Sequence, residues 1–431
     1  MNIFHFIYLP ILLYALKNHH RAFLLYVVMR LFLDPLVPFL YMDSQRLQMM
    51  LFMDTCMFAF AFLNYVSNMA KKTNPILNQF PLKKSFLICI SSILISSLLF
   101  SHVPFSQTLA SAYDHISQFI FVYLFWKELK KITDIRFIVK GLMIVFSIAI
   151  VYAFFERFDG FYNPLHEYKV SLNPSDFEAW IGGGGQEAVR GRTSSIFYSS
   201  LDCGAYAAIA VAFFFYINIS YKKIWNSAKP AKFIFMSGLF FLLMFANGRG
   251  AMLYFAISML FMLKLKKILG LSLFLPIFFI IFYDILAPSL ATVLSIYSQN
   301  ESEVQGSSWA MRVVQFLATI DVLKGSPWFG YGEKGVMYIQ SLRPEVLGME
   351  STWLQIMAKR GIVGVASYIY LYYSMFKLGF GKSKRYVLAS TVAWLALSTT
   401  TVGGDLHFQI SLFLIAYRLE LLSGSEIEVK K

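Results

Sequence analysis

Residues 85–101 read SFLICISSILISSLLFS, a run without a charged side chain that directly follows Lys83 and Lys84. A helix needs roughly 20 apolar residues to cross a bilayer core, so this run and its basic flank predict a membrane span. The whole chain shares this character, because 58% of its 431 residues are hydrophobic and only 14% are charged. Helices are the expected spanning elements, since they pair their backbone groups within one segment. The predicted fold class is an all-α integral membrane protein.

The apolar runs occur in pairs, and clusters of lysine and arginine separate one pair from the next. The positive-inside rule places such clusters in the cytoplasm, so the net charge of +14 indicates topology and no nucleic-acid partner. The runs lie near residues 22–41, 47–66, 85–101, 107–126, 136–156, 195–218, 233–247, 250–263, 268–287, 353–376, 386–400 and 404–420. They predict a polytopic protein with about 12 transmembrane helices, or about 13 if residues 3–16 also cross. Since no internal repeat or linker is evident, residues 1–431 are expected to form a single membrane domain.

Two connectors on the predicted outer side are much longer than the rest, at residues 157–194 and 288–352. They collect glycine, proline, tryptophan and charged residues, whereas the inner connectors are short. Long loops in compact proteins usually carry function. We therefore expect the chemistry on the extracytoplasmic side, and above all in the polar stretch that starts at Gly330-Tyr331-Gly332 and ends at Gly364.

Arginine occurs on this outer side, where the positive-inside rule disfavours it. Arg190 and Arg192 end the first long loop, Arg249 lies in a predicted tight turn with Gly248 and Gly250, and Arg312 lies on a predicted interfacial amphipathic helix. A guanidinium fork matches phosphate oxygens, which favours an anionic substrate. The alternatives are snorkelling to lipid headgroups and, for Arg249, capping of the preceding helix.

Neither a disulfide framework nor a metal site is predicted. The cysteines, Cys56, Cys89 and Cys203, have no paired spacing, and the histidines and acidic residues form no group with metal-ligand spacing. No metal and no other cofactor is therefore expected.

Several short motifs follow one another in a fixed order along residues 150–365. They are Arg190 or Arg192, Gly248-Arg249-Gly250, Arg312, Pro327-Trp328-Phe329-Gly330-Tyr331-Gly332, Glu350-Ser351-Thr352-Trp353-Leu354 and Gly361-Ile362-Val363-Gly364. In these motifs the chain resembles the O-antigen polymerase and O-antigen ligase family of bacterial inner-membrane enzymes. Ligases typically carry His-Asn where this chain has Glu350-Ser351, and this departure favours a polysaccharide polymerase.

The resemblance implies a glycosyltransferase on the outer face of the bacterial cytoplasmic membrane. It would polymerise polyprenyl-pyrophosphate-linked oligosaccharide repeat units into O-antigen, capsule or exopolysaccharide, without a metal or a nucleotide. The lipid-linked oligosaccharides are then both donor and acceptor, held in the lipid bilayer, and a chain-length regulator protein is a further expected partner. Two alternatives stay open: a ligase that transfers finished glycan to another acceptor, and a flippase or other transporter for the same lipid-linked sugars.

The implied chemistry assigns a role to each candidate residue. Negative charge grows on the departing pyrophosphate, so Arg192 and Arg312 are the candidate catalytic cations. Glu350 is the candidate general base for the acceptor hydroxyl, with a helix N-terminal acid as its structural alternative. The candidate substrate-binding residues are Arg190, Arg249, Trp309 and Trp353. For both tryptophans the alternative is anchoring at the membrane interface, and His166 and Asp202 are spare candidates for the base.

Overall fold

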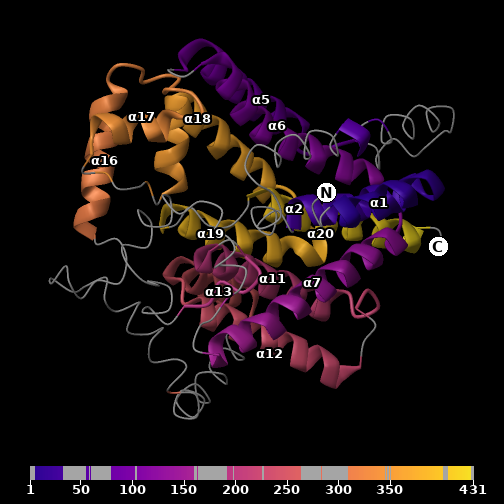
Figure 1. The fold of residues 1–431 in the computed structure, drawn as a ribbon. Coiled ribbons are helices and arrows are strands. Elements are labelled where there is room, and N and C mark those ends of the chain that lie inside the picture. Colours follow the sequence, from indigo (N-terminus) through magenta and orange to yellow (C-terminus); the bar gives the residue numbers. More distant parts are fainter. Residues whose placement is uncertain are drawn as a thin grey trace. The chain divides into compact units, whose positions relative to one another are not determined.

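The computed structural model describes most of the chain as helices (Figure 1). The described residues are 5–32, 55–57, 59, 79–101, 104–159, 163, 192–197, 199–225, 228–263, 283, 309–344, 346, 349, 351–400 and 406–428. No strand occurs among them, so the all-α class is confirmed for this part of the chain.

The helices coincide with most of the apolar runs. They are α1 (His5–Lys17), α2 (His19–Phe32), α5 (Lys83–Phe100), α6 (Phe105–Glu128), α7 (Ile132–Phe158), α11 (Ser200–Ser220), α12 (Lys229–Ala246), α13 (Arg249–Met262), α16 (Trp309–Leu323), α17 (Gly335–Leu342), α18 (Thr352–Phe376), α19 (Lys384–Thr400) and α20 (Leu406–Glu428). Among the described residues, 5 helices are long and apolar enough to cross a membrane, namely α5, α7, α11, α12 and the Leu406–Ser423 part of α20. The chain is thus a helical, multi-pass membrane protein. Nearly all of runs 47–66 and 268–287 lies outside the described residues, and the total of about 12 spans stays a prediction.

The chain divides into two compact units, which we describe separately. Unit 1 comprises Met1–Phe80, Phe121–Ala246 and His407–Lys431, and unit 2 comprises Pro81–Ile120 and Asn247–Leu406. Helix α6 passes from unit 2 into unit 1 between Ile120 and Phe121.

Helix α11 lies at the centre of unit 1. Small residues follow one another along it, and Gly204, Ala208 and Ala212 are all buried. Small side chains let helix backbones approach closely, and α11 packs against α12, which in turn packs against α7. Aromatic rings fill the space beside it, with Tyr206 and Phe408 of α20 at a centroid separation of 4.9 Å. The alanine-rich run at 203–212 is thus explained by close helix packing.

A polar contact in unit 1 joins α2 to the turn between α6 and α7. His20 Nε2 lies 3.1 Å from Asp134 Oδ1, and its Nδ1 contacts Glu128. Asp134 also accepts a backbone hydrogen bond from Lys131 N at 2.8 Å, which caps the start of α7. The side-chain hydrogen bonds to Asp134 and Glu128 raise the pKa of His20 from 6.5 to about 9. His20 is therefore protonated at neutral pH and holds two carboxylates together.

The pH dependence of stability tests this contact. A histidine with a raised folded-state pKa stabilises the fold fully below pH 6.5, and this contribution is lost as pH rises through about 9. Wild-type protein in detergent is expected to lose thermal stability across this window, and His20→Gln to show a flatter profile. Equal slopes for the two proteins would contradict the assignment.

Unit 2 is built on two helix pairs, α13 with α19 and α5 with α18. The α5 face towards α18 consists of small polar residues: Cys89 Sγ donates to Ser367 O at 3.5 Å, and Ser92 Oγ lies 3.3 Å from Ser367 Oγ. Residues of α5 at Ser85, Cys89, Ser92 and Ser96 recur at helical spacing and are buried. The serine-rich face of α5 is therefore the surface on which α18 packs.

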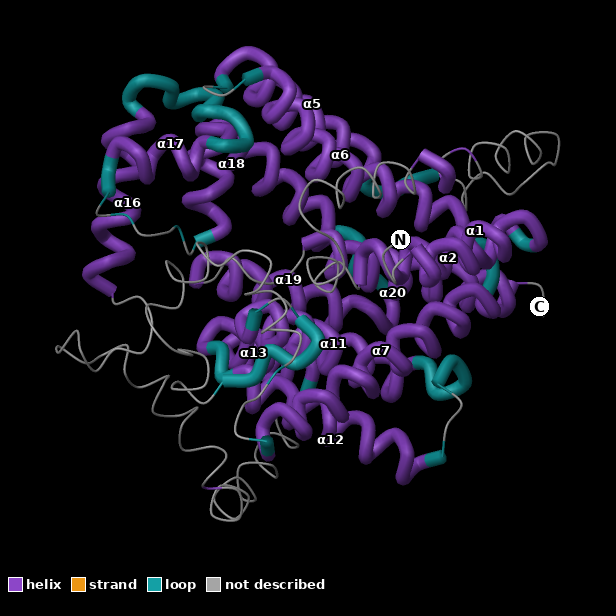
Figure 2. The backbone as a smooth tube through the Cα atoms, in the orientation of Figure 1, coloured by secondary structure: helices purple, strands orange, loops and turns teal. Residues whose placement is uncertain are grey.

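Helix α18 is interrupted at Gly361, where φ is 60° and ψ is −156°. The segment Pro327–Gly335 crosses α18 at this point, and we call the contact of this segment with Ala358–Val363 the glycine crossing. Tyr331 N donates to Ala358 O (3.0 Å), Ile362 N to Pro327 O (2.9 Å) and Val363 N to Trp328 O (3.0 Å). Figure 2 shows this loop, in teal between α16 and α17, beside α18.

Glycine is required at the crossing because the two backbones touch. A Cβ atom on Gly361 would lie 2.5 Å from the carbonyl carbon of Trp328, and one on Gly335 would lie 2.4 Å from Ala358 O. Gly330 also has a positive φ of 64°, which side chains rarely adopt. Gly330-Tyr331-Gly332 is predicted from the sequence to lie where the chemistry occurs, whereas the structure gives the two glycines a packing role.

Replacing Gly361 by alanine is expected to destabilise unit 2. The left-handed backbone alone costs about 1–3 kcal/mol for a residue with a side chain, and the contact with Trp328 adds to it. Gly141→Ala, in the interior of α7, is the control and is expected to be neutral or stabilising by up to about 1 kcal/mol. Thermal unfolding in detergent measures both, and a Gly361→Ala melting temperature equal to that of Gly141→Ala would refute the crossing.

Candidate functional site

The second long loop contains two helices that pack on the start of α18. Helix α16 faces this core with Ala318, and Ile339 of α17, Leu354 and Ala358 join it in one buried cluster. The opposite side of α16 exposes apolar residues at Val313, Phe316, Leu317 and Ile320. This spacing is that of an amphipathic helix, as predicted. Arg312 lies in the first turns of α16 and is half-buried.

Glu333, directly after Gly332, is the centre of a buried ionic cluster. Arg360 donates from Nε (2.8 Å) and Nη2 (2.7 Å) to Glu333 Oε1, while His115 Nε2 lies 2.8 Å from Oε2. Lys359 Nζ is 3.8 Å from Oε2, and Arg360 Nη1 donates to the Tyr368 hydroxyl at 2.6 Å. The Glu333 side chain is only 1% exposed. We call these residues the Glu333 cluster.

Charge balance explains why a carboxylate is tolerated at this depth. Burial alone would raise the pKa of Glu333, but the charge of Arg360 and the contacts with His115 and Lys359 outweigh it and hold the pKa well below its usual range. Buried ions are stable only when paired and hydrogen-bonded. The cluster therefore joins α6, the glycine crossing and α18 in one charged network.

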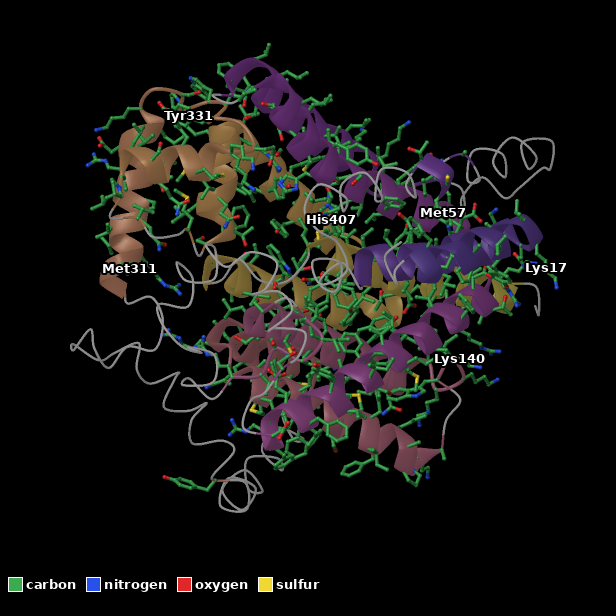
Figure 3. All side chains as sticks on the ribbon, in the orientation of Figure 1. Lys17, Met57, Lys140, Met311, Tyr331 and His407 are labelled. Carbon is green, nitrogen blue, oxygen red and sulfur yellow. The ribbon has the colours of Figure 1, made fainter. Side chains whose placement is uncertain are left out.

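Tyr331, labelled in Figure 3, anchors the same segment from the other side. Its hydroxyl donates to Val322 O at the end of α16, and its ring lies 4.7 Å from that of Tyr338 in α17. The glycine crossing thus holds α16 and α17 through Tyr331 as well as α18 through its backbone.

Arg192 lies in unit 1, in a short segment fixed to the C-terminal ends of two helices. Glu156 of α7 accepts hydrogen bonds from Ser194 N (3.1 Å) and Ser195 N (2.7 Å), and Thr193 N donates to Phe245 O of α12 (3.0 Å). Arg192 itself is buried, with 6% of its surface exposed. The last residues of the first long loop are therefore held firmly against α7 and α12.

The other candidate residues fall in different places. Arg249 is the first residue of α13 and is half-buried. A turn does precede Arg249. Its left-handed residue is Asn247, with a φ of 49°, whereas Gly248 has a negative φ. Trp353 Nε1 donates to Ser398 Oγ of α19 at 3.0 Å, and its ring packs on Tyr372. These contacts favour a packing role for Trp353.

Some candidates are not covered by the structure. Arg190, Glu350 and the spare base His166 lie outside the described residues, and so does the Trp309 side chain at the start of α16. Arg312, Arg249 and Trp353 belong to unit 2, whereas Arg192 and Asp202 belong to unit 1. That these side chains share one site stays a prediction.

The Glu333 cluster was not predicted from the sequence, although the sequence contains a signal for it. Lys359 and Arg360 are charges inside the predicted span 353–376, and His115 lies inside the span 107–126. Ionisable residues within membrane spans are rare and usually have a partner. Glu333 directly follows the Gly-Tyr-Gly motif, so the pairing of a loop carboxylate with charges in a span was open to inference.

No group of histidine, cysteine, aspartate and glutamate that fits a metal ion occurs in the part of the chain that the structure describes. The ionic contacts there are between protein side chains.

These features define a class of protein: a multi-pass helical membrane protein whose long loop folds back onto an interrupted helix through glycine contacts and buried charges. Residues 233–369 match the model of a family described as O-antigen ligase, from α12 to α18. This match supports assignment of the chain to the O-antigen ligase and polymerase family, whose members are glycosyl-transferring enzymes of glycan assembly. No curated protein matches the chain.

Replacing Glu333 by glutamine tests the cluster. Removing one partner of a buried ion pair typically costs about 3–5 kcal/mol because the other charge stays buried. Asp321→Asn is the matched control, since Asp321 pairs with Lys324 and Arg343 at an exposed position of the same loop, where salt bridges are worth about 0–1 kcal/mol. Thermal unfolding in detergent is expected to show a large loss for Glu333→Gln and little change for Asp321→Asn.

Thermal unfolding at acid pH tests whether the negative charge of Glu333, and not only the shape of its side chain, stabilises the fold. A carboxylate with a lowered folded-state pKa stabilises the fold above pH 4.5, the ordinary glutamate value, and this contribution is lost as pH falls below it. Glu333→Gln should therefore be less sensitive to acid than wild type. Equal stability of Glu333→Gln and wild type at pH 7 would contradict the network.

Proposed function

We propose that this protein polymerises polyprenyl-pyrophosphate-linked oligosaccharide repeat units into a surface polysaccharide on the outer face of the bacterial cytoplasmic membrane. The family match over residues 233–369 carries the proposal, because it covers the turn at Arg249, the helix with Arg312 and the glycine crossing in their expected order. The preference for polymerase over ligase rests on Glu350-Ser351, where ligases of the family typically carry His-Asn.

The reaction needs one bond exchange. An acceptor sugar hydroxyl attacks the anomeric carbon of the donor glycan, and the bond from that carbon to the pyrophosphate oxygen breaks. The polyprenyl pyrophosphate leaves with the bonding electrons, and the hydroxyl proton passes to a base, for which Glu350 is the candidate. Negative charge accumulates on the leaving group, so a cation placed there stabilises the transition state more than the ground state. Neither a nucleotide nor a metal takes part in the proposed step.

The packing of unit 2 supports a shared location for two of these groups. Helix α16, which carries Arg312, forms a buried cluster with Met349 and Leu354, the residues on either side of the Glu350–Trp353 stretch. Thr319 Oγ1 of α16 lies 4.0 Å from Met349 Sδ. The elements that bear the candidate cation and the candidate base are therefore in direct contact. Rigid elements of this kind hold catalytic groups better than free loops do.

Arg192 is proposed as the second cation. Its segment is fixed by Glu156 and by the Phe245 carbonyl, so the Arg192 backbone is already ordered without a substrate. Ordering before binding lowers the entropic cost of gripping a phosphate. A guanidinium presents its donors in a plane that matches two phosphate oxygens, which lysine does not reproduce.

A ligase is the second candidate function, favoured by the description of the family that the chain matches. It would use the same donor and the same charges, and only the acceptor would differ. The two functions separate in cells: without a polymerase, single lipid-linked repeats accumulate on the outer face, whereas without a ligase finished polymer is made and stays on its carrier.

Single substitutions in the reconstituted protein test the proposal. Arg192→Gln, Arg312→Gln and Glu350→Gln are each expected to lower the rate of chain extension on lipid-linked repeats, by about 10²–10⁴ for loss of the general base. Arg343→Gln, at a half-buried arginine of the same loop that pairs with Asp321, is the control and should extend chains at the wild-type rate. Normal product ladders from the first three variants would remove these residues from the mechanism, and inward accumulation of repeats in cells lacking the protein would indicate a flippase.

A further inference from the structure

Unit 1 contains a cavity of about 330 Å³ lined by Arg136, Lys140, Lys223 and Ile224. Three of the four lining residues are cationic, and none is acidic. The cavity belongs to neither long outer loop and to none of the candidate catalytic residues. Its volume is at the lower end of the roughly 300–1,000 Å³ typical of ligand pockets.

Two different elements bring the three cations together. Arg136 and Lys140 are one turn apart near the start of α7, so their side chains lie on one face of the helix. Lys223 comes from the turn after α11, which is closed by the hydrogen bonds from Tyr221 N to Ile217 O and from Ile224 N to Tyr221 O, both 2.9 Å. Lys140 is labelled on α7 in Figure 3.

Buried neighbours fix the Lys223 turn in place. Ile224 and Trp225 are 6% and 1% exposed. The Trp225 ring packs on Phe214 of α11 and Phe235 of α12, and Lys232 Nζ lies 5.4 Å from its centroid. The backbone of Lys223 is therefore set by the core, and its approach to α7 does not depend on a free loop.

The three cations lack a counter-charge in the part of the chain that the structure describes. All three side chains are exposed, and no side-chain hydrogen bond or ion pair joins any of them to another described residue. Like charges one helical turn apart destabilise a helix, and a third cation adds to this repulsion. An anion in the cavity would remove the repulsion and gain charge-assisted hydrogen bonds from a guanidinium and two ammonium groups.

The position of the cavity indicates the kind of anion. Arg136 and Lys140 lie at the start of a candidate membrane span, on the side that the sequence analysis predicts to be cytoplasmic. Lipid phosphates lie at this level, and basic pockets between helices on the cytoplasmic side bind anionic headgroups. We propose that Arg136, Lys140 and Lys223 form a phosphate-binding site, for the phosphate of an anionic phospholipid headgroup or for free phosphate, on the membrane face opposite the proposed active site.

Lipid binding to the full-length protein tests the site. Purified protein in nanodiscs of phosphatidylcholine is titrated with phosphatidylglycerol, and the bound lipid is counted by native mass spectrometry. The triple variant Arg136→Gln, Lys140→Gln, Lys223→Gln is expected to bind phosphatidylglycerol at least about tenfold more weakly than wild type, since each cation near the surface contributes about 1 kcal/mol. A second arm adds inorganic phosphate: displacement of the lipid identifies free phosphate as a ligand, and retention identifies the lipid headgroup.

The control variant removes the same number of positive charges from a different part of the protein. Lys83, Lys84 and Arg385 are one arginine and two lysines, all exposed and all predicted to be cytoplasmic. The variant Lys83→Gln, Lys84→Gln, Arg385→Gln should bind the lipid as wild type does. Equal losses in the two triple variants would show general surface attraction and overturn the site, and so would no loss in the first. If the first triple variant does not fold, Lys223→Glu alone, in an exposed turn, is expected to give the same loss, and wild-type binding by this variant would also overturn the site.

Discussion

The structure of unit 2 depends on the contact between the α18 backbone at Gly361 and the segment Pro327–Gly335. An interruption in a helix frees backbone groups, and inside a membrane protein it is tolerated only where other parts of the protein supply partners for them. Here Pro327 and Trp328 accept the hydrogen bonds of Ile362 and Val363. The two backbones approach so closely that Gly330, Gly335 and Gly361 have no room for a side chain. The kink in α18 and the fold of the long loop are therefore one feature.

The Glu333 cluster adds a charged layer to the same contact. The crossing alone orients the loop through neutral backbone hydrogen bonds, whereas Glu333 ties it to Arg360, Lys359 and His115 across three elements. A displaced loop would leave these charges buried and unpaired, which is costly. The loop is thus held in one register, and α16 with Arg312 is held with it. This positional constraint is what a transition-state cation requires.

The local properties of the chain were predictable from sequence, and its long-range contacts were not. Apolar runs predicted the positions of α5, α7, α11, α12 and α20, and spacing predicted the amphipathic α16, because both patterns reflect neighbouring residues. The glycines at 330 and 332 were recognised as special, but only the structure shows that Gly330 meets α18 and that Gly332 meets Ser101, since no periodicity reports which segments touch. Glu333 was missed for the same reason, because even Arg360, which donates to it, is 27 residues away in sequence, and His115 lies on a different helix. A tight turn was predicted at Gly248 and Gly250, and only the structure shows that Asn247 is its left-handed residue.

The central claim is that this protein forms a glycosidic bond and releases a lipid pyrophosphate in the same step. Purified protein, supplied with lipid-linked repeat units and no nucleotide or metal, should release one polyprenyl pyrophosphate for each glycosidic bond formed. Mass spectrometry of the carrier lipid alongside the length distribution of the glycan measures this ratio. Bond formation without release of the carrier, or passage of intact lipid-linked repeats across the bilayer with no new bond, would contradict the claim.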